Sequence, residues 1–188
     1  MMDRIGHNGG PTMEPGAAWR RHCWQAARAA LVPTLPLEVL RTRVRRAKDL
    51  GLDYKTYASV RAATGHDVVA CLFSSNALRL RPHQVELPPD RAERLFGVVA
   101  CDRVALVQGR IDGGAVLAAN PGLLDRVGRA PLALAGFREA GGALRLILGK
   151  VPGDRVVLIG DMTLEQAWCA AGRLGYYLPA ERYFAAVS

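Results

Sequence analysis

Helical periodicity dominates the first third of the chain. Apolar residues recur there every three or four positions, which is the spacing of one buried helix face. Helices are predicted over residues 17–31, from about 36 to 50 and over 54–64, with Gly51 and Gly65 as stop signals. Residues 1–15 are rich in glycine and proline and have no apolar period, so they are predicted to be a disordered tail.

After residue 65, short apolar runs replace the helical pattern. These runs predict buried strands over 67–73, 102–108, 132–136 and 154–161. The remaining periodic segments predict helices over 88–100, 120–128, 137–149 and 163–175. Apolar strands that alternate with helices favour a parallel sheet covered on both faces. The predicted fold is therefore α/β: a small, mostly parallel sheet with helices on both faces over 66–188, preceded by a basic helical region over 16–65.

The charge of the chain is uneven, which gives the basic region a candidate role. The net charge is +8, and residues 1–65 hold 11 Lys and Arg against 5 Asp and Glu, whereas residues 66–188 hold 14 against 12. A local excess of cations attracts phosphates. Compositional bias is the alternative explanation, since 22 of the 25 cations are arginine.

Two of the predicted helices are joined at a glycine within the basic region. Ala47 is small where the helices would cross, Gly51 lies at the turn, and apolar residues follow at Leu52, Tyr57 and Val60. With this pattern, residues 43–62 resemble a helix-turn-helix DNA-binding motif. No family is identified for the whole chain.

The resemblance implies two sets of DNA contacts. The exposed face of the second helix would enter the major groove with Tyr54, Lys55, Thr56 and Ser59. Cations of the first helix would contact phosphates, namely Arg41, Arg45, Arg46 and Lys48. A purely structural helical hairpin satisfies the same positions, so both interpretations stay open.

Polar residues at two predicted strand ends form a second candidate site, for a small ligand. They are Ser74, Ser75 and Asn76 after the first strand, and Asp161 with Thr163 after the last. In open parallel sheets, ligands bind beyond the carboxyl ends of the strands. The alternative is local: Asp161 and Thr163 cap a helix, with Thr163 paired to Gln166, and the other three residues shape a turn.

Known catalytic motifs are absent from the sequence. It contains no phosphate-binding loop, GxSxG, GxGxxG or HExxH, and its four cysteines have no CxxC spacing. His66 and His83 flank the first predicted strand. A histidine near a loop is more often a solvated side chain than a catalytic partner for a serine such as Ser74 or Ser75. No metal and no cofactor are therefore predicted.

Taken together, these patterns favour a non-enzymatic regulator that contacts DNA and binds a small ligand or a partner. A small α/β enzyme or nucleotide-binding protein with its site at the strand ends is the first alternative. The second is a structural scaffold or homodimer paired through the C-terminal aromatic residues Tyr176, Tyr177, Tyr183 and Phe184. No apolar run is long enough to span a bilayer, and the N-terminus has no signal pattern, so a cytoplasmic, bacterial-type protein without a membrane partner is expected.

Overall fold

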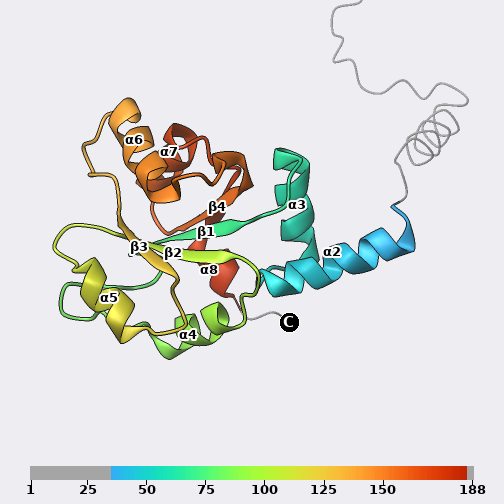
Figure 1. Ribbon diagram of the computed structural model, residues 1–188, viewed down its shortest axis with the longest axis horizontal. Coiled ribbons are helices and arrows are strands. Elements are labelled where there is room, and N and C mark those ends of the chain that lie inside the picture. The colour runs from blue at the N-terminus through green and yellow to red at the C-terminus, as the bar shows by residue number, and fades with distance from the viewer. Residues whose placement is uncertain (1–34, 186–188) are drawn as a thin grey trace, which may run out of the picture. The chain divides into compact units, whose positions relative to one another are not determined.

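Five parallel strands form one sheet in the computed structural model of the protein, which describes residues 35–185 (Figure 1). The strands are β1 Ala70–Ser74, β2 Asp102–Val107, β3 Arg126–Arg129, β4 Val156–Gly160 and β5 Tyr176–Pro179. Their order across the sheet is β3-β2-β1-β4-β5, and every neighbouring pair is parallel. The predicted α/β fold is confirmed.

The described helices include those predicted over 54–64, 88–100, 137–149 and 163–175. They are α2 Leu37–Asp49, α3 Tyr54–Thr64, α4 Pro89–Phe96, α5 Gly113–Ala119, α6 Phe137–Leu148, α7 Thr163–Ala171 and α8 Ala180–Phe184, with a 3-10 turn at Gly153–Arg155. The Asp53 carboxylate begins α3 by accepting from the backbone N–H of Thr56 at 2.8 Å. Gly65 ends α3 with a φ of 72°, where glycine is favoured. The predicted tail over 1–15 and helix over 17–31 lie outside the described residues.

Helices cover both faces of the sheet, as predicted. Successive residues of a strand face opposite sides. In β1, Leu72 belongs to a buried cluster with α6 and α7, whereas Phe73 belongs to a second cluster with α3, α4, α5 and α8. Figure 1 shows the same separation, with α6 and α7 on one side of the strands and α4, α5 and α8 on the other.

From residue 41 onward, the predicted basic helical region belongs to the same compact unit as the sheet. The chain divides into two compact units, Met1–Leu40 and Arg41–Ser188. Ala47, Leu50 and Tyr57 are buried in the same cluster as Phe73. The unit that contains the sheet therefore begins well before the boundary predicted at residue 66.

Two elements predicted in the middle of the chain are wrong. Residues 120–128, predicted to be a helix, contain the start of β3, and residues 132–136, predicted to be a strand, lie outside the sheet. β3 has the sequence RVGR and lies at the edge of the sheet, so it needs no continuous apolar run. The helix before it, α5, was not predicted because it begins with two glycines, which are poor helix formers.

Three of the C-terminal aromatic residues, Tyr176, Tyr183 and Phe184, pack in the core that contains Phe73, whereas Tyr177 packs against the other core. Tyr183 is buried, with its ring 5.4 Å from that of Phe73. The guanidinium of Arg91 lies 3.9 Å from the centre of the Phe184 ring. A dimer contact through this segment stays a prediction, and Tyr183 is not available for it.

Candidate ligand site at the carboxyl edge of the sheet

The loops that follow β1 and β4 lie side by side. The two strands are parallel neighbours, paired from Ala70 with Val156 to Phe73 with Ile159, so both loops leave the same edge of the sheet. The chain runs from β1 outward to β3 and then returns to the other side of β1 to form β4. The strand order therefore reverses between β1 and β4, which is where open α/β sheets bind ligands.

Two cavities at this edge share Asn76 and Leu80. The first has a volume of about 610 Å³ and is lined by the loop after β1 and by Asp161 and Met162 after β4. The second, of about 750 Å³, is lined by residues that follow β1, β2 and β3. We call the two cavities together the carboxyl-edge cleft.

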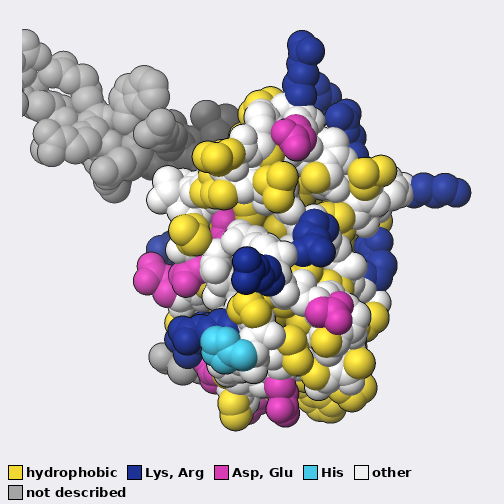
Figure 2. Space-filling view, turned by 90° about the vertical axis from the view of Figure 1, so that its left-hand side faces the viewer, with side chains coloured by type: hydrophobic (Ala, Val, Ile, Leu, Met, Phe, Trp, Pro, Cys, Tyr) yellow, Lys and Arg dark blue, Asp and Glu magenta, His cyan; other side chains and the backbone are white. Residues whose placement is uncertain are grey.

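Positive charge predominates in the carboxyl-edge cleft. Its lining includes four arginines, Arg79, Arg81, Arg110 and Arg129, and one carboxylate, Asp161. Figure 2 views the side of the molecule at which the loops after β2 and β3 emerge, and Lys and Arg side chains are scattered over this face, some of them near its middle among hydrophobic side chains. An anionic ligand is therefore favoured at this edge.

Buried polar contacts shape the loop after β1. The Ser74 hydroxyl accepts from the backbone N–H of Ala77 at 3.1 Å, and Arg91 Nε donates to the Ala77 carbonyl at 3.1 Å. Burial lowers the pKa of Arg91. Arg79 has a φ of 57°, in the left-handed region that non-glycine residues seldom adopt. The Arg91 bond connects the loop after β1 to α4.

Sequence reasoning missed Glu165 as well as Gln108 and the four arginines of the cleft. Glu165 is fully buried in the first turn of α7. Its Oε1 accepts from Asn76 Nδ2 at 2.9 Å, and its Oε2 accepts from the backbone N–H groups of Asp161 at 2.6 Å and Met162 at 3.1 Å. The carboxylate therefore joins the loop after β1 to the loop after β4. Its sequence signal is a Glu three residues after Met162, the residue that precedes α7, but Met162 lacks the hydroxyl of the usual capping pattern.

Gly160 makes room for this carboxylate. A Cβ at Gly160 would lie 2.6 Å from Glu165 Oε2 and 2.7 Å from Tyr177 Cε2, so any larger residue would displace one of them. The Tyr177 hydroxyl donates to the Met162 carbonyl at 3.3 Å. Burial, followed by the nearby charge of Glu165, raises the pKa of Tyr177.

The predicted ligand residues divide into those that line the cleft and those that do not. Ser75, Asn76 and Asp161 line it. Ser74 is fully buried and caps the turn instead, which agrees with the local alternative. Thr163 is exposed and lines neither cavity, and the predicted Thr163–Gln166 capping pair is wrong, because Glu165 supplies the side-chain acceptor at the start of α7.

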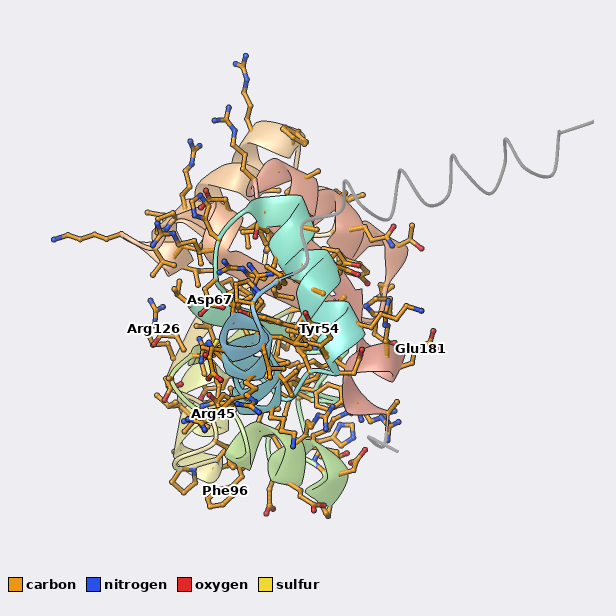
Figure 3. The ribbon with its side chains drawn as sticks, turned by 90° about the vertical axis from the view of Figure 1, so that its right-hand side faces the viewer. Arg45, Tyr54, Asp67, Phe96, Arg126 and Glu181 are labelled. Atoms are coloured by element: carbon orange, nitrogen blue, oxygen red, sulfur yellow. The ribbon has the colours of Figure 1, made fainter. Side chains whose placement is uncertain are left out.

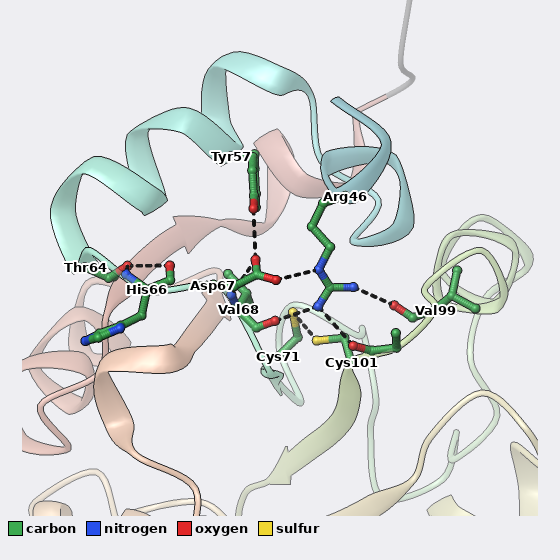
Figure 4. A network of polar contacts seen from close by, with 10 residues as sticks. Arg46, Tyr57, Thr64, His66, Asp67, Val68, Cys71, Val99 and Cys101 are labelled. Carbon is green, nitrogen blue, oxygen red and sulfur yellow. Dashed lines mark hydrogen bonds and ion pairs between the residues drawn. The ribbon is translucent and has the colours of Figure 1, made fainter. Parts of the chain in front are cut away.

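Arg46, predicted to contact DNA phosphates, is held in an internal network (Figure 4). Its Nε donates to Asp67 Oδ2 at 2.9 Å. Its two terminal nitrogens donate to the backbone carbonyls of Val68, Val99 and Ala100, at 2.7 to 3.2 Å. Asp67 also accepts from the Tyr57 hydroxyl at 3.0 Å. The prediction that Arg46 is available to phosphates is therefore wrong, since all three of its nitrogens donate within the protein.

Thr56 is also not on an exposed face. It is buried, and its hydroxyl donates to Asp53 Oδ2 and accepts from Arg182 Nη2 at 2.7 Å. The prediction that Thr56 reads bases is wrong because its side chain completes the start of α3.

The other predicted DNA contacts differ in their exposure. Arg41, Arg45, Lys48, Lys55 and Ser59 are partly or fully exposed, and Tyr54 is half-buried. Figure 3 shows Arg45 and Tyr54 on the side of the molecule that carries α2 and α3. Base reading from α3 would therefore depend on Lys55 and Ser59, with Tyr54 at its start.

His66 does not approach the serines at the carboxyl ends. Its Nε2 lies 3.5 Å from Asp154 Oδ2, and Asp154 precedes β4, so His66 is at the opposite edge of the sheet. Cys71, Cys101 and Cys169 are free thiols, with 3.7 Å between the sulfurs of Cys71 and Cys101.

Neither a metal centre nor a membrane span is found between residues 35 and 185. That part of the chain contains no group of three or more His, Cys, Asp or Glu side chains able to hold a metal ion. None of its helices is both long and apolar enough to cross a bilayer. In comparisons with known proteins, no protein-family model, curated protein or solved structure matches this chain.

Proposed function

We propose that this protein binds a small phosphate-bearing ligand in the carboxyl-edge cleft. The observation that carries the proposal is that four arginines line the cleft, two of them, Arg79 and Arg81, in the cavity where the strand order reverses. Guanidinium groups pair with phosphate oxygens through two parallel hydrogen bonds.

The size of the cleft and the state of its arginines support a small ligand. The cavity volumes of about 610 and 750 Å³ are in the range of small-molecule sites, roughly 300–1,000 Å³. Arg81 and Arg110 form no ion pair with the described residues, so neither is neutralised by a carboxylate there. Both guanidinium groups are available to a ligand.

Inorganic pyrophosphate is expected to bind the full-length protein, and Arg81→Ala and Arg110→Ala are each expected to weaken binding about tenfold. Each substitution removes one charged donor group from one of the two cavities. Isothermal titration calorimetry at low salt measures the affinity.

Arg145→Ala is the matched control, because Arg145 is exposed on α6 and lines neither cavity. Its affinity for pyrophosphate should equal that of the unaltered protein. The proposal fails if pyrophosphate does not bind, or if all three variants bind it equally.

DNA binding through α2 and α3 is a second proposed function. It is supported by the exposure of Arg45, Lys48 and Lys55, together with the Gly51 turn between the two helices, where φ is 67°. Each phosphate that the protein neutralises makes its affinity for a duplex more sensitive to salt.

Random duplex DNA is the probe for this second function. The triple change of Arg45, Lys48 and Lys55 to alanine should reduce the slope of log affinity against log salt by about 0.9 for each phosphate that the variant no longer neutralises. Fluorescence anisotropy over a salt series measures the slope. Absence of binding by the unaltered protein at about 50 mM salt, where the attraction to phosphates is strong, rejects DNA binding.

A further inference from the structure

We infer that Asn76 and Gln108 select a nucleoside phosphate by accepting hydrogen bonds from its nucleoside, because Glu165 orients both amide groups. The inference rests on the proposed phosphate site and concerns the rest of the ligand. Glu165 has the role of a positioning residue, whereas the two amides would touch the ligand.

Glu165 acts on its surroundings as an acceptor. A carboxylate offers two oxygens and no donor. Oε2 is occupied by the backbone N–H groups of Asp161 and Met162, which leaves Oε1 to face the side chains of Asn76 and Gln108. Any amide beside Oε1 must turn its NH₂ group toward it, because an amide oxygen there would be repelled.

Asn76 uses its whole NH₂ group within the protein. Nδ2 donates to Glu165 Oε1 at 2.9 Å and to Met162 Sδ at 3.1 Å. An amide nitrogen carries two hydrogens, so the group that remains for a ligand is the acceptor Oδ1. Asn76 is one of the two residues that line both cavities.

Gln108, the residue after β2, turns one N–H of its amide toward the same carboxylate. Its Nε2 lies 3.5 Å from the same Glu165 oxygen, and its side chain lines the second cavity. Leu80, Ile111 and Pro131 line that cavity too and form an apolar wall. The cleft thus combines cations for phosphate, apolar surface for a base and amide oxygens for hydroxyl or amino donors, which are the three parts of a nucleoside phosphate.

Two probes separate this inference from the phosphate site itself. ADP carries phosphates and a nucleoside, whereas pyrophosphate carries phosphates alone. Asn76→Ala and Gln108→Ala are each expected to weaken ADP binding about tenfold and to leave pyrophosphate binding unchanged. Calorimetry with the full-length protein gives both affinities, and circular dichroism verifies folding.

Glu165→Gln tests the positioning role. The glutamine has the size of glutamate but brings its own NH₂ group, so Asn76 can turn its oxygen inward toward it. ADP affinity should fall while pyrophosphate affinity is retained. A general loss of stability would lower both affinities. If this variant does not fold, the Asn76 and Gln108 variants still decide the inference.

The possible results have distinct meanings. A loss of ADP affinity for Asn76→Ala with unchanged pyrophosphate affinity supports the inference, and 2′-deoxy-ADP then shows whether the 2′-hydroxyl is the donor or another group of the nucleoside is. Equal losses for both probes, or no loss for ADP, overturn the role of the amides and leave the phosphate site standing. If the unaltered protein binds neither probe, both proposals are overturned.

Discussion

Replacing Glu165 with alanine is expected to lower the free energy of unfolding by about 3 kcal/mol. Alanine removes the acceptor shared by Asn76 and the backbone N–H groups of Asp161 and Met162. It also leaves a cavity in a position that is fully buried. Urea denaturation followed by far-UV circular dichroism measures the change.

Gln166→Ala is the matched control for this prediction. Gln166 is the next residue of α7 and is exposed, so its replacement should alter the free energy of unfolding by no more than about 0.5 kcal/mol. Equal stability of the two variants would mean that Glu165 does not hold the loops after β1 and β4 together.

Arg46→Ala is expected to cost about 2 kcal/mol of stability, less than a fully buried pair would, because the Asp67 side chain is partly exposed to solvent. The guanidinium connects α2 to Asp67 and Val68 before β1, and to Val99 and Ala100 before β2. Alanine leaves an acidic side chain and three carbonyls without this donor, and α2 loses its polar connection to the sheet. Lysine should not restore the stability, because a single ammonium cannot reproduce the planar set of donors.

Arg45→Ala is the control, since Arg45 is the preceding residue of the same helix and is exposed. Its free energy of unfolding should stay within about 0.5 kcal/mol of the unaltered protein. Chemical denaturation of the two variants side by side gives the comparison. A similar, small effect for both would show that the Arg46 network contributes nothing measurable to stability.

Prediction of the secondary structure succeeded where a segment is buried and failed at the edge. β1 and β4 are buried along their whole length and β2 over its last four residues, so each carries an apolar run that sequence reasoning recognised. β3 has a single neighbour, and its two arginines flank Val127 and Gly128, so its pattern did not indicate a strand and residues 120–128 were predicted to be a helix. α5 is stabilised by Asp112 at its start and by burial of Val116, which its glycines obscured.

The candidate site was only partly visible in the sequence. Asn76 and Asp161 were identified because polar residues follow apolar strands. Glu165 was not identified, because its burial depends on Gly160 leaving space and on the loop after β1 bringing Asn76 to it. Arg110 and Arg129 come from loops and strands distant in sequence, and no local pattern connects them to Arg79.

The sequence by itself determined the fold class and the covering of both sheet faces, because burial on two sides demands apolar strands and amphipathic helices. It also determined that cations gather near the amino end. Only the tertiary structure decided the strand order, and with it the meeting of the two polar loops. The tertiary structure also decided the partners of the charged side chains, because these are set by packing between distant segments. Arg46 donates hydrogen bonds to Asp67 and three backbone carbonyls, whereas Arg81 lines the cleft.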